Sequence, residues 1–303
     1  MNAIIQIVNL NKKTWQWLTL SVLALIWGSS FILMKKGLES FSFGQVAGLR
    51  IFISFLFLLP FALKRISKVK KEQIKSLLVV GLCGNAIPAF LFTKAQTHVS
   101  SSMAGILNAL TPLFVLITGL SIYKVKFIWQ NLIGVIIALF GAAALVISRF
   151  GFTFSAENIY PLFIVFATIL YSFSVNEIKQ NLSGLDGLTI IAVAFLFVGP
   201  VAGIYLLNSD FTPALRTPGF TVSLSCIIIL AVFGSAIANF IFNYLVFYTS
   251  AVFATSVTYL IPIVAIFWGL ADGESLLLKQ FPAIVLVLGG IYLVNKKPKK
   301  IEV

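Results

Sequence analysis

Long uncharged apolar stretches alternate with short charged segments along most of the chain. Six of these stretches contain no Asp, Glu, Lys or Arg, and they lie at 15–34, 76–93, 99–123, 127–148, 158–176 and 187–207. Each is close to the ~20 residues that cross a bilayer as an α-helix. Residues 43–63 follow the same pattern with Arg50 as their one charge. Because lipid offers no partner to an exposed backbone amide, and the stretches show no period of two, they are predicted to be helices and not strands of a barrel.

The C-terminal part of the chain predicts three more helices. No charged residue occurs from Thr217 to Ala271, a stretch too long for a single membrane crossing. It divides most naturally at residues 248–250, which gives an eighth and a ninth helix, and residues 280–295 form a short tenth helix. The predicted fold class is therefore an all-α integral membrane protein with ten transmembrane helices.

Composition excludes most other classes of protein. Hydrophobic residues make up 59% of the chain, charged residues 10%, and the mean hydropathy is +1.03. A water-soluble protein of this length does not accommodate such values. The apolar residues of 1–14 precede Lys12 and Lys13, the reverse of the order in a signal peptide, so the first helix is expected to stay in the protein.

An internal repeat relates the two halves of the chain. Residues 74–137 align without a gap with residues 224–287 at an offset of 150, and thirteen of these 64 positions are identical. Glycines and helix-interior prolines are among them, as in the pairs Gly84/Gly234 and Pro112/Pro262. Repeats of this kind are typical of transporters whose substrate site lies between the two copies. The expected organisation is a cytoplasmic segment 1–14, five-helix repeats at 15–148 and 158–295, and a basic tail at 296–303.

The basic residues predict an orientation. One alternating set of connecting segments carries fifteen Lys and Arg residues and the other set carries six, which assigns both termini to the cytoplasm. The loop near Lys68 belongs to the basic set, whereas its counterpart near Arg216 belongs to the other. Five helices per copy is an odd number, so the second copy is expected to be inverted relative to the first. The net charge of +13 is then explained by topology and by attraction to anionic lipid, not by binding of nucleic acid.

The chain resembles the EamA-type branch of the drug/metabolite transporter superfamily. The resemblance rests on the helix count, the repeat, residues 27–31 (Trp-Gly-Ser-Ser-Phe) in the first helix, Arg50 in the second, and the helices that contain Pro112 and Pro262. It implies a location in the inner membrane and a central cavity lined mainly by the third, fourth, eighth and ninth helices, with gates from the first and sixth. It does not identify a substrate.

Polar and aromatic residues inside the helices are the candidates for that cavity. Amides buried in lipid are costly unless they meet a partner or water, so they are expected to face the bundle interior. They either bind substrate or form hydrogen bonds between helices, and both alternatives stay open. The candidate substrate-binding residues are Trp27, Asn85, Asn108, Thr111, Tyr171, Asn239, Asn243, Thr258 and Tyr259.

A second group of residues is assigned to gating or to structure. An isolated guanidinium in hydrocarbon is expensive, so Arg50 either forms a structural clamp or contacts a carboxylate substrate. Prolines free backbone carbonyls one turn earlier, where a substrate or water is received, or else they only kink the helix. The residues of this group are Ser30, Arg50, Pro88, Pro112 and Pro262.

No motif for catalysis, a metal or a cofactor appears in the sequence, so the protein is not expected to be an enzyme or to carry a cofactor. The leading hypothesis is a secondary transporter of the inner membrane that exports small metabolites such as amino acids by alternating access. The alternatives are an intramembrane lipid-modifying enzyme and a non-transporting scaffold. Expected partners are a small-molecule substrate and membrane lipid, with the protein either a monomer or a homodimer.

Overall fold

The structure is a computed structural model that describes residues 12–123, ten positions between 133 and 148, residues 159–249, Ala254, residues 257–274 and residues 278–295. These residues form helices and turns without a strand. The first half contains α2 (Lys13–Leu38), α3 (Phe43–Arg65), α4 (Ile74–Gly81), α5 (Ile87–Gln96), α6 (Ser101–Asn108) and α7 (Thr111–Ser121). The second half contains α9 (Tyr160–Asn181), α10 (Gly187–Leu207), α11 (Thr212–Leu215), α12 (Phe220–Ile229), α13 (Ala238–Tyr248), α15 (Val257–Ala271) and α16 (Phe281–Asn295).

Seven helical segments of the described residues are long and apolar enough to cross a membrane. They are Lys13–Leu38, Phe43–Lys68, Lys71–Gln96, Ser101–Ser121, Tyr160–Asn181, Gly187–Leu207 and Phe220–Leu245. Two shorter apolar helices, Leu260–Ala271 and Phe281–Gly290, follow. The predicted helix at 127–148 lies largely outside the described residues, so all-helical membrane architecture is confirmed while the count of ten stays a prediction.

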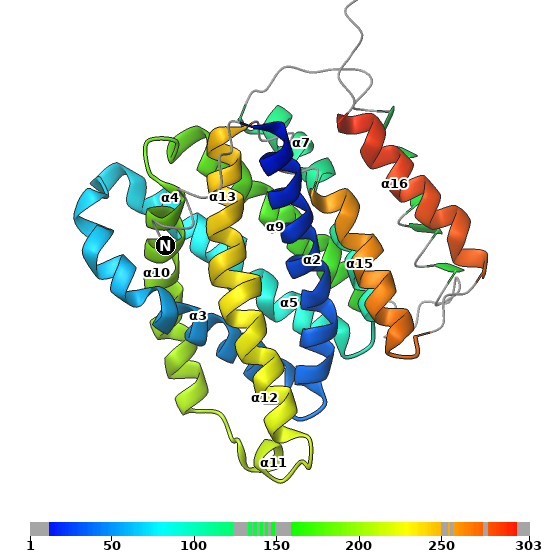
Figure 1. Cartoon of the computed structure of the whole chain (residues 1–303), viewed down its shortest axis with the longest axis horizontal. Helices are drawn as coiled ribbons and strands as arrows, with labels where there is room; N and C mark the ends of the chain where they lie inside the picture. The colour runs from blue at the N-terminus through cyan, green and yellow to red at the C-terminus, as the bar shows by residue number, and fades with distance from the viewer. Residues whose placement is uncertain are drawn as a thin grey trace, which may run out of the picture.

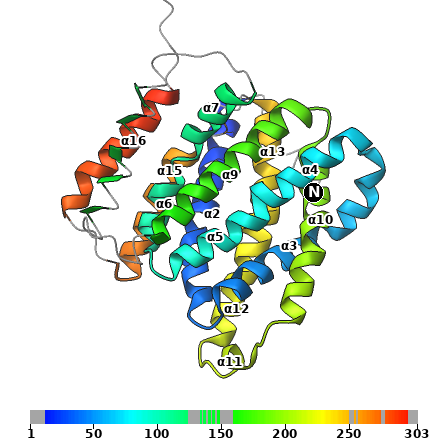
Figure 2. The same ribbon diagram turned by 180° about the vertical axis from the view of Figure 1, so that it is seen from behind.

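The helices form one bundle in which distant parts of the chain lie side by side (Figures 1 and 2). The closest helix pairs all join the two halves: α3 packs along α10, α2 along α15, and α5 and α7 along α9. Buried residues from both halves make up the main hydrophobic core. Apolar side chains such as Phe140 and Leu207 are exposed instead, as expected of a surface that faces lipid. Neither half therefore has a core of its own.

Two predicted helices are interrupted by π-helical turns at matching places. The third predicted helix passes from α4 to α5 through the π-helical segment η3 (Leu82–Ala86), and the eighth passes from α12 to α13 through η5 (Leu230–Ile237). The segments overlap at the repeat offset of 150, and each contains the glycine of the Gly84/Gly234 pair. Such π-turns are rare and mark functional sites often. The apolar pattern alone predicted plain helices here.

The fourth predicted helix is broken rather than continuous. Residues 99–123 form α6 and α7, with a turn at Ala109 and Leu110 between them, and Pro112 lies in the first turn of α7. Proline is favoured in a first turn because its missing N–H would have no partner there. The hydroxyl of Thr111 donates to the Asn108 carbonyl at 2.8 Å. That carbonyl, which was expected to receive a substrate or water, therefore already accepts a hydrogen bond.

Candidate functional site

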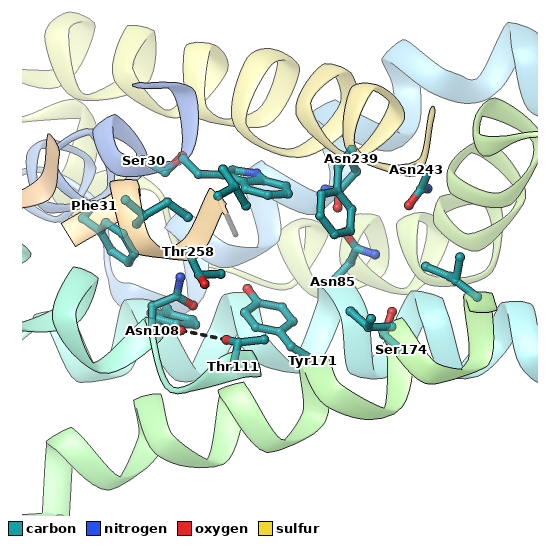
Figure 3. A pocket seen from close by; sticks show the side chains of 18 of the residues that line it. Ser30, Phe31, Asn85, Asn108, Thr111, Tyr171, Ser174, Asn239, Asn243 and Thr258 are labelled. Carbon is teal, nitrogen blue, oxygen red and sulfur yellow. Dashed lines mark hydrogen bonds between the residues drawn. The ribbon is translucent and has the colours of Figure 1, made fainter. Parts of the chain in front are cut away.

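A cavity with a volume of about 140 Å³ lies between helices of the two halves (Figure 3). Its walls come from α2, α3, η3, α5, α6, α7, α9, α13 and α15. Ten of the fourteen residues singled out from the sequence line it, and these are Trp27, Ser30, Arg50, Asn85, Asn108, Thr111, Tyr171, Asn239, Asn243 and Thr258. The structure thus brings most of the candidates together, while their contact with a substrate remains a prediction.

The remaining candidates do not contribute described side chains to the cavity. Tyr259 lies in α15, but its side chain is outside the described part of the structure. Pro88 and Pro112 occupy the first turns of α5 and α7, and Pro262 lies inside α15. None of the three prolines lines the cavity. The two alternatives for Pro112 and Pro262, a freed backbone carbonyl and a kink, stay predictions.

Apolar residues of the cavity wall were not among the candidates. Their type resembles that of core residues, so the hydrophobic pattern does not distinguish them. The repeat does, because Phe92 and Phe242 are an identical pair at the offset of 150. The wall residues that sequence reasoning missed are Phe31, Met34, Gly84, Phe92, Ser174, Val175, Ile178, Phe242, Val257 and Ile261.

The cavity is lined by equivalent positions of the two halves. Helix α2 contributes residues 27, 30, 31 and 34, and α9 contributes residues 171, 174, 175 and 178. These two sets coincide at a single offset of 144. Two lining residues of α6 and α7, Asn108 and Thr111, correspond at an offset of 150 to Thr258 and Ile261 of α15. The same helix faces of both halves therefore surround one space.

Ring contacts repeat this correspondence. The rings of Trp27 and Phe242 have centroids 5.2 Å apart, and those of Tyr171 and Phe92 lie 5.9 Å apart. Each pair joins the first helix of one half to the wall of the other, because Trp27 corresponds to Tyr171 and Phe242 to Phe92. The Trp27 indole also donates through Nε1 to the Gly234 carbonyl at 3.0 Å. Aromatic pairs of this kind add stability beyond the area that they bury.

Each π-helical segment places a glycine close to a serine of a facing helix. A Cβ atom at Gly84 would overlap the Ser174 hydroxyl, and one at Gly234 would lie 2.8 Å from the Ser30 hydroxyl. Ser30 and Ser174 are themselves equivalent at the offset of 144. Only glycine permits this approach of backbone to a facing helix. Both contacts join the two halves of the chain at the cavity wall.

The amides of the wall differ in how their donors are used. Asn85 donates to the Val80 carbonyl at 3.1 Å and Asn239 to the Ser235 carbonyl at 2.7 Å, each within its own helical segment. Asn243 donates to the Gly187 carbonyl of α10, at 3.4 Å. A bond between helices, which was one alternative for these amides, is therefore observed at Asn243, whereas Asn85 and Asn239 donate to carbonyls of their own segments.

Asn108 and Tyr171 present polar atoms to the cavity. Figure 3 shows their side chains pointing toward each other and toward Thr258. Within the described residues, neither the Asn108 amide nor the Tyr171 hydroxyl forms a hydrogen bond through its side chain. Among the described residues, Gln96 Oε1 is the one side-chain N or O atom that is both fully buried and without a hydrogen bond. The polar atoms of Asn108 and Tyr171, which also lack a hydrogen bond, are therefore not fully buried. Water or a solute in the cavity can reach them.

One end of the bundle is held by a group of charged residues, which we call the ion-pair cluster: Lys35, Lys36, Asp272 and Glu274. Lys35 Nζ lies 2.7 Å from Asp272 and 2.9 Å from Glu274, and Lys36 Nζ lies 2.8 Å from Asp272. The cluster ties the end of α2 to the chain that follows α15.

Glu274 also fixes the start of α6. Its carboxylate accepts from the backbone N–H of Ser101 at 2.8 Å and from that of Ser102 at 3.0 Å, and it accepts from the Ser102 hydroxyl at 2.8 Å. Burial alone would raise the pKa of Glu274, but hydrogen bonds from Lys35 and these serines outweigh it and leave the pKa below its ordinary value. Hydrogen bonds from Lys35 and Lys36 likewise lower the pKa of Asp272. Three helices therefore meet on two ionised carboxylates.

The opposite end of the bundle is joined differently. The Tyr123 hydroxyl, just after α7, donates to Glu177 of α9 at 2.8 Å. Arg65 at the end of α3 forms an ion pair with Asp186, the N-cap of α10, at 2.7 Å. The ion-pair cluster links α2 to the chain after α15, but α9, the equivalent of α2, forms no such ion pair with α7 or α15 among the described residues at this end. At this end the Tyr123–Glu177 hydrogen bond joins α7 to α9, and the ion pair joins α3 to α10.

The fold and the cavity together define a multi-pass helical membrane protein whose two related halves enclose one cavity with polar and apolar walls. The model of the EamA-like transporter family matches residues 14–147 and matches again at residues 158–296. The chain belongs to the EamA-like transporter family, and through it to the drug/metabolite transporter type expected from the sequence.

Known relatives agree with this assignment. An "Uncharacterized transporter" of Archaeoglobus fulgidus is 25% identical over 93% of this chain and 99% of its own length. The "Uncharacterized inner membrane transporter YedA" of Escherichia coli is 28% identical over 92% of each chain. A "Probable terminal-alkyne amino-acid exporter" of Streptantibioticus cattleyicolor is 24% identical over 86% of this chain and 84% of its own. A crystal structure with 14% identity superposes with a TM-score of 0.65 over 93% of this chain and 96% of that one, which shows a shared fold.

Proposed function

We propose that the protein is a secondary transporter of the inner membrane that exports a small metabolite by alternating access. The observation that carries this proposal is the cavity lined by equivalent positions of α2 and α9, which faces polar atoms of both halves. Inverted halves around one site allow the same contacts to close either end in turn. Binding of the solute to Asn108, Tyr171 and Asn239 is part of the proposal.

The ends of the helices support inverted halves. The end of α2 meets the end of α15 and the start of α6 in the ion-pair cluster, so α2 and α15 run in one direction and α6 runs in the other. Tyr123 after α7 meets Glu177 near the end of α9, so α7 and α9 run in the same direction. The first helices of the two halves, α2 and α9, are therefore antiparallel.

Loop charges support the orientation with both termini in the cytoplasm. Under this proposal the loop at Lys68 lies inside, whereas the loop at Arg216 and the ion-pair cluster lie outside. Both Lys68 and Arg216 are exposed, so each is a suitable site for a thiol probe. Labelling of Lys68→Cys and Arg216→Cys from opposite faces of the membrane is expected, and labelling from one face would contradict the inversion.

The size of the cavity and one relative support amino acids or related compounds as substrates. A cavity of about 140 Å³ is close to the ~150 Å³ of an engineered protein cavity that holds benzene, so it suits a small solute. The relative from Streptantibioticus cattleyicolor is named as a probable exporter of a terminal-alkyne amino acid. Both considerations favour compact metabolites over large ones.

The test is solute counterflow in proteoliposomes. Proteoliposomes that contain the purified protein are loaded with an unlabelled mixture of amino acids and hydroxy acids. They are expected to accumulate the labelled form of at least one of these solutes from outside. Asn239→Leu is expected to abolish accumulation while leaving thermal unfolding unchanged, because it removes a polar atom from the cavity. Asn208→Leu is the matched control, since Asn208 is exposed at the end of α10. Absence of accumulation for every solute in the wild type would contradict the proposal.

A further inference from the structure

Arg50 gives the cavity a charge that no other wall residue balances. It lies in α3 and is the one Lys or Arg of the cavity lining, and that lining contains no Asp or Glu. Ion pairs of Arg50 with a carboxylate are absent throughout the residues described. A guanidinium away from bulk water is costly without an anion or strong acceptors around it. The occupied site therefore favours a solute that brings a negative charge.

The donors of Arg50 are only partly used. Its Nε atom donates to the Ser235 hydroxyl of η5 at 2.7 Å, which orients the guanidinium across the boundary between the two halves. Its terminal nitrogens form no hydrogen bond with any residue that the structure describes. These nitrogens are also not fully buried, because within the described residues the one fully buried side-chain N or O atom without a hydrogen bond is Gln96 Oε1. The terminal nitrogens can therefore receive a ligand that enters the cavity.

The second half of the chain shows that the fold does not need this arginine. At the offset of 144, which superimposes Trp27 on Tyr171 and the start of α3 on the start of α10, Arg50 corresponds to Ala194. Ala194 is fully buried in α10. The same place in an equivalent helix is thus filled by a methyl group. The packing of this helix therefore does not require a charge at this place, which leaves the guanidinium available to the solute site.

We propose that Arg50 binds the carboxylate of a small organic anion, whose apolar part lies among the rings of Trp27, Phe92, Tyr171 and Phe242. This inference rests on the proposed transport function and names its substrate class. The planar guanidinium matches a carboxylate with two parallel hydrogen bonds, a geometry that an ammonium or an amide does not reproduce. Asn108 and the Tyr171 hydroxyl are available for a hydroxyl or amino substituent next to the carboxylate. Solutes with a net positive charge are rejected.

The test compares acids with their amides in the counterflow assay. The probes are 2-hydroxy-4-methylpentanoate, L-leucine and the carboxamide of each, at equal concentration. In the wild type, each acid is expected to compete roughly tenfold or more better than its amide, because amidation removes the anion that Arg50 binds. Arg50→Gln is expected to reduce competition by the acids to that of the amides. Arg216→Gln, an exposed arginine exchanged for the same residue, is the control that keeps the wild-type ratio.

Two further variants separate binding from folding. Arg50→Lys keeps the charge without the planar fork and is expected to give an intermediate ratio of acid to amide. Ser235→Ala removes the acceptor that orients Nε and is expected to lower the ratio less than Arg50→Gln does. Protein yield and thermal unfolding are recorded for each variant. If Arg50→Gln does not fold, the ratio of acid to amide competition in the other proteins decides the question. It is expected to fall from the wild type through Ser235→Ala to Arg50→Lys.

Equal competition by acids and amides in the wild type would overturn the inference, as would a ratio that persists in Arg50→Gln. Transport of neutral or cationic solutes with no response to any carboxylate would overturn it while leaving the proposed transport function intact. A protein that moves no solute at all contradicts the transport function itself. The outcomes of the two proposals are thus distinguishable.

Discussion

The two ends of the helix bundle are built on equivalent helices but joined by different contacts. Lys35 at the end of α2 pairs with two carboxylates, whereas its equivalent at the end of α9, Lys179, is exposed and has no ion pair among the described residues. The repeat offset of 150 replaces Asp272 and Glu274 by Ile122 and Lys124. Residue 124 lies outside the described residues, but as a lysine it has the same charge as Lys179 and cannot form an ion pair with it.

This difference shows how two related halves of a chain can lose their symmetry at charged positions without changing their fold. Cavity wall residues, ring pairs and glycine contacts correspond between the halves, because they hold the helices at the distances that the bundle needs. The charges at the helix ends are under no such requirement. We therefore expect the end that holds the ion-pair cluster to be the more stable of the two and the other end to separate more easily.

Glu274→Ala is expected to give the largest effect. The carboxylate accepts four hydrogen bonds, from Lys35, the backbone of Ser101 and two groups of Ser102, and its removal is expected to cost about 3 kcal/mol. The measurement is thermal unfolding in detergent. Glu39→Ala is the matched control, because the Glu39 carboxylate is exposed and its one ion pair within the described residues is that with Lys36. An equal loss in both variants would contradict a special role for Glu274.

Coupling between Lys35 and Glu274 is the next effect in size. In a double-mutant cycle of Lys35→Met and Glu274→Gln, the double variant is expected to lose less free energy of unfolding than the sum of the two single losses, by about 1–2 kcal/mol. The reason is that each single variant leaves the remaining charge with one partner fewer in a partly buried place. Thermal unfolding of the four proteins gives the coupling, and simple additivity would show that the 2.9 Å contact carries no energy of its own.

Acid is expected to weaken the same end. The pKa of Asp272 and that of Glu274 lie below their ordinary values of 3.8 and 4.5, so the stabilisation is complete above pH 4.5 and is lost as the pH falls through the lowered values. Stability is therefore expected to change little between pH 8 and pH 6 on account of these groups. A melting curve against pH checks this, and the double variant Asp272→Asn, Glu274→Gln is expected to flatten the acid limb. An unchanged limb in that variant would exclude the cluster as its cause.

The smallest effect is expected at the opposite end. Asp186→Asn removes the ion pair with Arg65 but keeps a side chain that can cap α10, so about 0.5–1 kcal/mol should be lost. The ion-pair cluster is not touched, and the response of the protein to Glu274→Ala should be unaltered. A loss as large as that of Glu274→Ala would remove the contrast between the two ends.

The sequence predicts the helices well where charges or caps bound them. Residues 187–207 were predicted as a helix and form α10 over the same range, because Asp186 caps its start and Asn208 follows its end. The break between α6 and α7 was missed although Pro112 offered a signal, since a proline in an apolar run was interpreted as a kink within one helix. The π-turns were not predicted either, and they lie where Gly84 meets Ser174 across the bundle, a contact that no local pattern contains.

The polar part of the cavity wall could be predicted because an amide or arginine within a lipid-facing stretch demands an explanation. The apolar part could not, because Phe31 and Met34 are as suitable for a core as for a cavity. Their correspondence with Val175 and Ile178 was available in the offset of 144. It becomes informative only when the two helices are seen to face the same space.

Side-specific labelling at Met34 and Ile178 tests alternating access most directly. These equivalent residues line the cavity from α2 and α9, toward its two ends. In a background with Cys83→Ser and Cys226→Ser, Met34→Cys and Ile178→Cys each provide one thiol, measured with a membrane-impermeant reagent from either face. Adding Glu274→Gln is expected to raise outside labelling at position 34 and to lower inside labelling at position 178. If labelling rose at both positions together, or changed at neither, the two ends would not open in alternation and the account would be wrong.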